Sequence, residues 1–331
     1  MAPDVAALLA ERGISAPETP LAHNGFSGAR ISRIEHHGAT YFLKRMRFED
    51  DWIMRGLGDT TCREAEFAAS SIPGRLPANV RVPYLGAARD GDGWAVLSGD
   101  ISPYLFAQDG VEPAEAWEVI LAALAEMHAA FLAEPLADAG VGWCPWRERL
   151  TFLSPSTAES LAGEGIDFGA ADGWRAFRRV ADSRVQEVIF GLLADPAPLL
   201  RVMAQLPATL LHADAKIANM GLEGGALWLF DWADVTVAPV GLEIGYMLAV
   251  NSSRLPWGHE ETLARYAALL ERCLGPARLS KIGWRRQVAV AVLSGFMVLG
   301  WAKASEAESG RRDEFNWWCG RISEAVDVLE L

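Results

Sequence analysis

The segment at residues 210–232 constrains the fold of this chain more than any other part of the sequence. It reads LLHADAKIAN over residues 210–219 and, after a turn at Glu223-Gly224-Gly225, continues as LWLFDW over residues 227–232. Short apolar runs separated by polar residues and glycine turns predict strands and loops rather than a helix. The segment therefore predicts a polar loop followed by a short β-hairpin.

Three residues of this segment, Asp214, Asn219 and Asp231, carry groups that suit phosphoryl transfer. That reaction needs one carboxylate to receive or orient the proton of the acceptor, and two oxygen ligands to hold Mg²⁺ against the phosphates. The five-residue step from Asp214 to Asn219 spans one loop, and the twelve-residue step to Asp231 crosses the hairpin and returns to the same end. We therefore expect all three side chains to converge.

The pattern HADAKIAN followed by FDW resembles the His-x-Asp-x-x-x-x-Asn and metal-Asp motifs of the aminoglycoside phosphotransferase and choline kinase-like family. The resemblance implies an α+β, protein-kinase-like fold of two lobes. The first lobe would be a small antiparallel β-sheet with one helix, and the second would be larger and mostly α-helical. It also implies Mg²⁺ as cofactor, ATP or GTP as co-substrate, and a small-molecule acceptor.

The resemblance also assigns roles to residues of the segment. Asp214 would be the catalytic base, and Asn219 and Asp231 the Mg²⁺ ligands. Lys216 would contact the γ-phosphate and neutralise charge during transfer. His212 precedes the base by two residues, and we expect it to brace the loop by hydrogen bonding rather than to act as a base.

The upstream residues that the family pattern requires are present. Lys44 lies in the strand-like YFLKR and would contact the α- and β-phosphates. Glu64 follows 20 residues later on a predicted helix and would orient Lys44 by an ion pair, although Glu66 is close enough to compete. The chain has only four lysines, and two of them, Lys44 and Lys216, occupy motif positions.

Two further segments are expected to contact the nucleotide. Residues 24–29, NGFSGA, lie where the family places a phosphate-covering turn, and Gly25, Ser27 and Gly28 would bring backbone N–H groups close to phosphate oxygens. Residues 97–101, which include Asp100, would connect the lobes, where backbone groups meet the purine edge. We therefore divide the chain into a nucleotide-binding lobe, 1–99, and a catalytic and acceptor-binding lobe, 100–331.

The secondary structure follows from local patterns. In the first lobe we expect strands at 31–35, 40–45, 82–86 and 94–97, and a helix at 60–71 capped by Thr60 or Thr61. The second lobe should begin with a helix at 113–132, contain further helices within 135–205, and be helical again from 241 to 331.

The acceptor should bind between the catalytic loop and the later helices, within 135–205 and 241–331. Glu243 stands near the Asp that the family places after its metal motif, and Asp234 is expected in a solvated turn. Eight tryptophans in these regions are expected in the core rather than in the site. They are Trp143, Trp146, Trp174, Trp257, Trp284, Trp301, Trp317 and Trp318.

Composition excludes some functions. A formal net charge of −13 and a pI of about 5.0 disfavour nucleic-acid partners and suit a cationic or neutral acceptor. The four cysteines show no metal or redox spacing, and we expect buried free thiols. The amino terminus lacks a basic start, and the apolar run 288–302 is too short to span a membrane. We expect a cytoplasmic protein without a membrane partner.

Two other functions remain open from the sequence. Lys216 is typical of protein kinases, but the metal motif reads Asp-Trp-Ala rather than Asp-Phe-Gly, and no Ala-Pro-Glu segment follows. A catalytically silent nucleotide-binding module would keep the fold without chemistry. The intact Asp214, Asn219 and Asp231 argue against that alternative.

Overall fold

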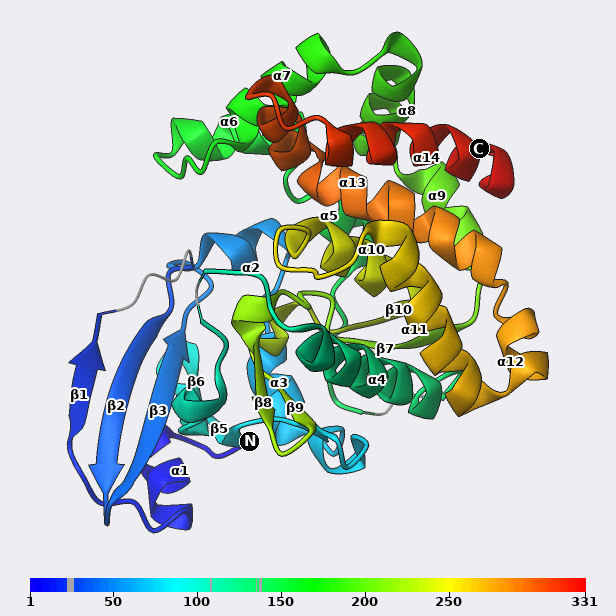
Figure 1. Cartoon of the computed structure of the whole chain (residues 1–331). Helices are drawn as coiled ribbons and strands as arrows, with labels where there is room; N and C mark the ends of the chain where they lie inside the picture. Colours follow the sequence, from blue (N-terminus) through cyan, green and yellow to red (C-terminus); the bar gives the residue numbers. More distant parts are fainter. Residues whose placement is uncertain (23–26, 108, 135, 137–138) are drawn as a thin grey trace.

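The computed structural model describes residues 1–22, 27–107, 109–134, 136 and 139–331. A small β-rich lobe and a larger helical lobe lie side by side (Figure 1), and β6, a strand of the first lobe, ends at Gly99. The α+β two-lobed architecture expected from the sequence is confirmed.

The first lobe is an antiparallel sheet in the order β1-β2-β3-β6-β5. Its strands are β1 (Glu18–Leu21), β2 (Arg30–His36), β3 (Ala39–Met46), β5 (Tyr84–Asp90) and β6 (Gly93–Gly99). The predicted hairpin at 31–45 is present as β2 and β3. The strand expected at 82–86 begins at Tyr84 and runs to Asp90, because Pro83 has no N–H for a sheet hydrogen bond.

Three α-helices accompany this sheet: α1 (Val5–Glu11), α2 (Trp52–Gly56) and α3 (Arg63–Ala69). Helix α3 packs against β5 and β6. The expected Thr60 or Thr61 cap is wrong. Cys62 occupies the N-cap position with φ of 59°, and the Asp59 carboxylate accepts a hydrogen bond from the Arg63 N–H at 3.0 Å.

The second lobe contains α4 (Ala114–Ala130) and short strands around the polar loop, with helices stacked beyond them (Figure 1). Its own strands are β7 (Ala208–Leu211), β8 (Met220–Glu223), β9 (Ala226–Leu229) and β10 (Thr236–Pro239), and β4 (Val80–Arg81), from the earlier part of the chain, pairs in parallel with β9. The other helices are α5 (Trp146–Thr151), α6 (Pro155–Gly163), α7 (Ala170–Val180), α8 (Ser183–Ala194), α9 (Ala197–Met203), α10 (Gly241–Val250), α11 (His259–Leu274), α12 (Pro276–Lys281), α13 (Trp284–Glu308) and α14 (Asp313–Leu329). Single turns of 3-10 helix lie at Pro73–Arg75, Ser102–Tyr104, Ile217–Asn219 and Trp232–Asp234.

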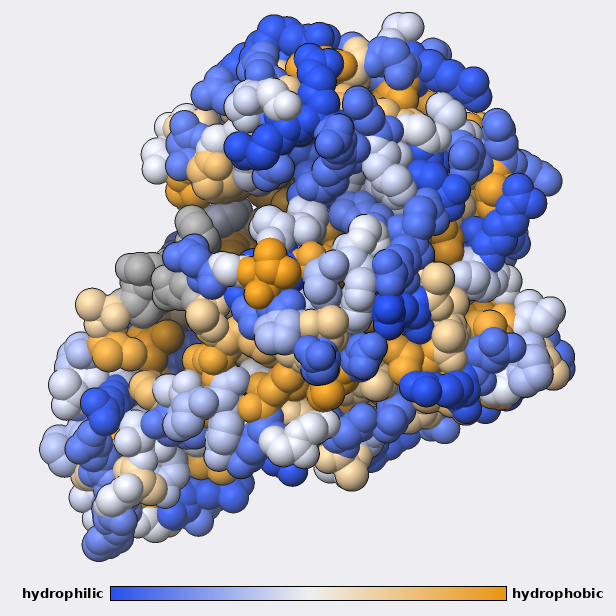
Figure 2. All heavy atoms as spheres, viewed as in Figure 1, coloured by the Kyte–Doolittle hydropathy of each residue, from blue (hydrophilic) through white to orange (hydrophobic). Residues whose placement is uncertain are grey.

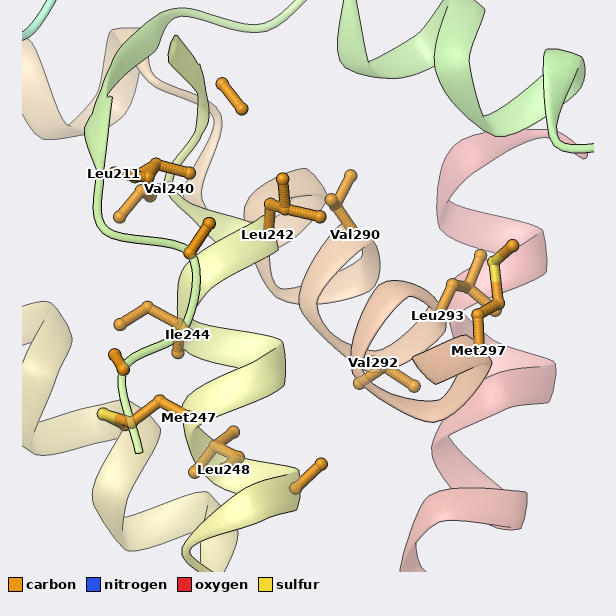
Figure 3. Packing of buried hydrophobic residues seen from close by; sticks show 14 of the residues in the cluster. Leu211, Val240, Leu242, Ile244, Met247, Leu248, Val290, Val292, Leu293 and Met297 are labelled. Carbon is orange, nitrogen blue, oxygen red and sulfur yellow. The ribbon is translucent and has the colours of Figure 1, made fainter. Parts of the chain in front are cut away.

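Helices α10 and α13 form the centre of this lobe. Leu242 and Val290 meet between them, while Ile244 and Met247 point away from α13 (Figure 3). Their backbones come so close that a Cβ at Gly245 would lie 2.0 Å from the Ala291 carbonyl oxygen. Because α10 also borders the polar loop, this contact fixes the position of the loop relative to the core.

Helix α13 is long and apolar enough to cross a membrane by length and composition, yet 72% of its most apolar window is buried inside the protein. It packs against α7, α10 and α14, as expected of a core helix. In the face that Figure 2 shows, hydrophilic residues cover most of the surface, and apolar residues form separate patches, several of them across the middle of the molecule. All four cysteines are free, but Cys273 is exposed and only Cys62 and Cys144 are buried.

Candidate active site

The polar loop between β7 and β8 is held in one conformation by hydrogen bonds from His212. Its Nε2–H donates to the Phe230 carbonyl at 2.9 Å, and its Nδ1 accepts from the Asp214 N–H at 3.2 Å. Ala213 between them adopts φ of 61°, a left-handed conformation that costs energy for a residue with a Cβ. The expected bracing role of His212 agrees with these contacts.

A buried carboxylate on α10 is hydrogen-bonded to the backbone of the same loop. Glu243 on α10 is fully buried and accepts hydrogen bonds from the N–H groups of His212 at 3.3 Å and Ala213 at 3.0 Å. It also contacts His128 Nε2 at 2.7 Å, and His128 Nδ1 contacts the Tyr266 hydroxyl at 2.6 Å. A buried carboxylate with these partners is satisfied, so Glu243 is a structural support of the loop.

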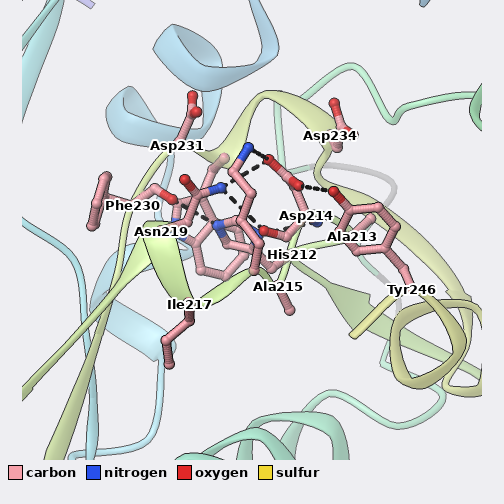
Figure 4. Close-up of polar contacts among 12 residues, drawn as sticks. His212, Ala213, Asp214, Ala215, Ile217, Asn219, Phe230, Asp231, Asp234 and Tyr246 are labelled. Atoms are coloured by element: carbon pink, nitrogen blue, oxygen red, sulfur yellow. Dashed lines mark hydrogen bonds and ion pairs between the residues drawn. The ribbon is translucent and has the colours of Figure 1, made fainter. Parts of the chain in front are cut away.

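Asp214 is the most densely bonded side chain of the loop (Figure 4). Its Oδ1 accepts from the Tyr246 hydroxyl at 2.6 Å, and its Oδ2 accepts from Lys216 Nζ and Asn219 Nδ2, each at 2.8 Å. Burial alone would raise the pKa of the Asp214 carboxyl, but Lys216 outweighs burial and lowers that pKa. Asp214 is therefore ionised at neutral pH and aimed into the cleft between the lobes.

Lys44 on β3 forms two ion pairs, one within the first lobe and one with the second lobe. Its Nζ lies 2.7 Å from Glu64 Oε2 on α3 and 2.6 Å from Asp231 Oδ1. Glu66 does not compete, because it accepts a hydrogen bond from the Gly142 N–H at 2.7 Å instead. Burial alone would lower the pKa of Lys44, but the two carboxylates outweigh it and the pKa is raised, so Lys44 stays charged.

Asp231 is tied to the polar loop through its neighbour Phe230. The Phe230 N–H donates to the Asn219 carbonyl at 3.2 Å, while the Phe230 carbonyl accepts from His212. Asp231 has φ of 65°, and its carboxylate pairs with Lys44 of the first lobe. The β8–β9 hairpin, which pairs Met220 with Leu229, therefore returns the chain to the loop as the spacing predicted.

The donor set at this point fits a magnesium ion held together with phosphates. In the described part of the chain, no cluster of three His, Cys, Asp or Glu side chains could hold a metal alone. Mg²⁺ in such sites needs only one or two protein oxygens, because substrate phosphates and water complete the octahedron. Lys44 contacts one carboxylate oxygen of Asp231, and the Asn219 amide nitrogen donates to Asp214, which leaves an oxygen on each for the ion.

Asp234 was expected in a solvated turn, and that expectation is wrong. The residue is 9% exposed and its Oδ2 lies 2.9 Å from Arg149 Nε on α5. Arg149 also donates to the Ala213 carbonyl at 2.7 Å and stacks on the Tyr246 ring at 4.5 Å. Burial raises the pKa of Asp234 to about 6, with Arg149 opposing the shift and Asp214 adding to it.

The residues expected around the phosphates and the purine divide into three groups. Gly25 lies outside the described residues. Ser27 lines the cleft, whereas Gly28 is needed for packing, because a Cβ there would lie 1.9 Å from the Asp50 carbonyl oxygen. Asp100 is exposed and accepts from the Ser102 N–H at 2.8 Å, so its side chain belongs to a turn, while its neighbour Gly99 lines the cleft.

The cleft between the lobes has a volume of about 770 Å³. Lys44, Glu64, Asp214, Lys216, Asn219 and Asp231 all line it, so the structure brings these predicted residues to one place. None of the eight tryptophans of the helical regions lines it.

Sequence reasoning missed four residues of this site: Tyr84, Arg149, Asp234 and Tyr246. Tyr84 donates to Glu64 Oε1 at 2.9 Å and accepts from the Trp232 N–H. Tyr246 lies one helical turn after Glu243, and that spacing would have placed it beside the loop. Arg149 has no local signal, because its partner lies 85 positions away.

Comparisons with known proteins give one family match. The model of the phosphotransferase enzyme family matches residues 18–282, which is most of the chain. No protein of the curated set matches the sequence.

Solved structures with a similar arrangement have low sequence identity. The chain is 16% identical to a thermostable mutant of aminoglycoside phosphotransferase APH(4)-Ia with ADP and hygromycin B, covering 97% of each chain at a TM-score of 0.48. It is 13% identical to a choline/ethanolamine kinase family protein from Mesorhizobium loti, covering 96% of this chain and 90% of that chain at 0.45. It is 12% identical to ADP-bound aminoglycoside phosphotransferase APH(2'')-Ib, covering 97% of this chain and 95% of that chain at a TM-score of 0.47.

Proposed function

Because this chain belongs to the phosphotransferase enzyme family, we propose that it transfers the γ-phosphoryl group of ATP or GTP to a hydroxyl group of a small molecule. The observation that carries the proposal is the bonding of Asp214 to Lys216 and Asn219 beside the Lys44–Asp231 ion pair. Phosphoryl transfer depends mainly on positioning and on electrostatic stabilisation, and this cluster supplies both.

Each residue has one task in this reaction. Asp214 orients the acceptor hydroxyl and takes its proton, which suits a carboxylate that is ionised at neutral pH. Lys44, oriented by Glu64, holds the α- and β-phosphates. The Lys216 side chain lines the cleft and is 36% exposed. Its positive charge contacts the γ-phosphoryl group and offsets the negative charge that develops there during transfer.

Asn219 and Asp231 would hold Mg²⁺. When bound, the ion neutralises phosphate charge and aligns the phosphates for in-line displacement. The hydrogen bond between Asn219 and Asp214 keeps the base and this ligand in a fixed relation, so that base and phosphates approach the acceptor from defined directions. Ser27 and the backbone of Gly99 would meet the phosphates and the purine, respectively.

The proposal extends to the organisation of the chain. Residues 1–99 form the nucleotide-binding lobe and residues 100–331 the catalytic and acceptor-binding lobe of a cytoplasmic enzyme without nucleic-acid or membrane partners. Aminoglycosides and other antibiotics, amino alcohols and sugars are the acceptor classes that the family assignment leaves open. A protein acceptor is disfavoured because no Ala-Pro-Glu segment follows Asp231.

The test is Mg²⁺-dependent turnover of ATP and GTP by the wild-type protein and by Asp231→Ala. We expect turnover that requires Mg²⁺ and is nearly abolished in the variant, because the remaining ligand Asn219 carries no charge. The exposed Asp92→Ala variant, whose side chain is 72% exposed, serves as the control. Wild-type turnover in Asp231→Ala would refute the metal assignment, and nucleotide binding without turnover in any condition would favour the silent binding module.

A further inference from the structure

A short helix of the first lobe closes the cleft at the end away from the lobe connection. Strand β3 pairs with β6 so that Tyr41 faces Gly99 and Met46 faces Trp94. The chain leaves for the second lobe at the Gly99 end, whereas the segment leading to α2 leaves at the Met46 end. The connection between the lobes and the segment leading to α2 therefore lie at opposite ends of β3.

At the α2 end the lobes are joined by stacked rings. Trp52 stacks on Phe152 with ring centroids 5.3 Å apart and planes 7° apart, and on Phe168 at 5.6 Å. A Cβ at Gly56 would lie 2.4 Å from the Phe152 ring, so helix and ring are in direct contact. The Phe168 ring in turn contacts Trp301 on α13. Aromatic pairs of this kind make the closure specific as well as apolar.

The part of the cleft beneath α2 is lined mainly by apolar side chains. Asp214 lines the same cleft, so an acceptor bound in this part lies in one continuous space with the base. The apolar lining residues are Ile53, Met54, Leu57, Leu153, Val298 and Leu299. An acceptor bound here buries apolar surface, which favours its binding.

The carboxylates that line this part, within the described residues, already have partners. Asp51 accepts from the N–H groups of Ile53 and Met54, Asp59 accepts from the Arg63 N–H, and Asp234 pairs with Arg149. An ammonium group placed here would lose its hydration and would have to compete with these partners for a carboxylate. Several ammonium groups on one acceptor would multiply that cost.

Size adds a further restriction. The cleft of about 770 Å³ has to hold the nucleotide as well as the acceptor, and sites for single small molecules occupy roughly 300–1,000 Å³. The part that remains for the acceptor is therefore small.

We propose that the acceptor is a compact, predominantly apolar alcohol with at most one charge, bound between α2, the α5 end and α13, rather than a polycation. This inference rests on the proposed phosphotransferase function and departs from the cationic acceptor that the acidic composition favoured. The net charge of −13 is spread over the chain, whereas the charges beside Asp214 are paired.

The test compares two probes on the complex of the full chain with Mg²⁺ and the ATP analogue AMP-PNP. One probe is 8-anilinonaphthalene-1-sulfonate, which is apolar with a single charge, and the other is the polycation gentamicin. Calorimetry measures both on the wild type, on Leu299→Asp in the proposed pocket, and on Leu331→Asp, which adds the same charge at the exposed carboxy terminus.

We expect the apolar probe to bind the wild type more tightly than gentamicin does, and Leu299→Asp to weaken the apolar probe at least about tenfold. Leu331→Asp should leave that affinity unchanged. Tighter binding of gentamicin, or an apolar-probe affinity that Leu299→Asp does not change, would overturn the proposal. If Leu299→Asp fails to fold, Leu299→Ser serves the same comparison.

Binding of the nucleotide itself distinguishes a failure of the proposed phosphotransferase function from a failure of the proposed acceptor class. Failure of the wild type to bind Mg-AMP-PNP would count against the phosphotransferase function, whereas the order of the two probes can still be measured on the free protein and decides the nature of the acceptor pocket.

Discussion

The two halves of the cleft are built by different physical means. In the catalytic half, polar contacts hold the functional side chains: Asp214 accepts from three groups, and Lys44 bridges Glu64 and Asp231. In the acceptor half, apolar side chains and stacked rings from distant segments form the walls, and the lining carboxylates are paired. Position is therefore set by hydrogen bonds and charge in one half, and by packing in the other.

The two halves of the cleft should differ in the amino-acid substitutions that they tolerate. Hydrogen bonds and ion pairs in a buried site depend on exact partners, and removing one partner leaves a polar group unsatisfied. Apolar walls tolerate substitution that conserves volume but respond strongly to added bulk or charge. We therefore expect conservative changes to be severe in the catalytic half and mild in the acceptor half.

The largest expected effect follows from Asp214→Asn, which breaks the catalytic half without changing its shape. Asn fills the same space but does not take the acceptor proton. We expect kcat to fall on the order of 10²–10⁴-fold, while affinity for Mg-nucleotide stays near the wild-type value, because Lys44, Asn219 and Asp231 are unchanged. Paired calorimetry and steady-state kinetics measure the two quantities. Asp100→Asn, in an exposed turn, is the control.

Loss of nucleotide affinity with little change in kcat would move Asp214 from catalysis to binding. Comparable loss of both quantities would indicate a damaged loop.

The second prediction concerns Asp234, which lies where the two halves meet. Its pKa is raised to about 6 by burial, so the folded protein holds this proton between pH 4 and 6 more firmly than the unfolded chain does. The contribution of this group to the free energy of unfolding is present below about pH 4 and is lost as pH rises to about 6. The loss is about 3 kcal/mol.

Urea unfolding of the wild type and of Asp234→Asn across this range measures that contribution. As pH rises, the unfolding free energy of the wild type should fall relative to that of the variant. This trend is expected even if the two proteins differ in stability at every pH. Parallel curves would show that Asp234 keeps an ordinary pKa.

Glu243→Gln tests the polar support of the loop with a smaller expected effect. Glu243 accepts only, from two backbone N–H groups and His128 Nε2, so the amide of Gln turns an N–H toward one of these donors. One buried donor loses its partner, and we expect about 1–3 kcal/mol less stability. Thermal unfolding measures it against the exposed Glu330→Gln. Equal stability of both variants would mean that the loop does not depend on Glu243.

The catalytic half was largely predictable from the sequence, because its signal is local. Spacing within residues 210–232 placed Asp214, Asn219 and Asp231, whereas the family resemblance indicated Glu64 as the partner of Lys44 and left Glu66 open. The convergence depends on one loop and one hairpin, and both are encoded by neighbouring residues.

The acceptor half was not predictable, because its contacts join distant segments. Trp52 and Phe152 are 100 positions apart, and Arg149 and Asp234 are 85 apart. Asp234 looked like a turn residue for the same reason, since nothing near it in the sequence indicates that Arg149 covers it. Gly28 was assigned to the phosphates from the sequence, and the structure adds a packing requirement that the sequence did not indicate, because a Cβ there would meet the Asp50 carbonyl oxygen.

The smallest expected effect is the change in stability caused by Gly56→Ala. This substitution tests whether the packing of α2 against Phe152 positions the acceptor half. In a helix, Ala is more favourable than Gly by about 1 kcal/mol, so propensity alone predicts a gain in stability. The new Cβ, however, would lie 2.4 Å from Phe152 Cε2. The ring cannot move without disturbing Trp52, which stacks on both Phe152 and Phe168. Overpacking costs about 1–3 kcal/mol, so we expect a net loss of about 1 kcal/mol.

Gly191→Ala on α8 is the matched control, since a Cβ there meets no atom within 4 Å. It should gain roughly 0.5–1 kcal/mol from helix propensity alone. Urea midpoints should therefore move in opposite directions for the two substitutions. A gain at both positions would show that α2 is free to shift over Phe152, and the acceptor half would then be an open surface rather than a pocket closed by stacked rings.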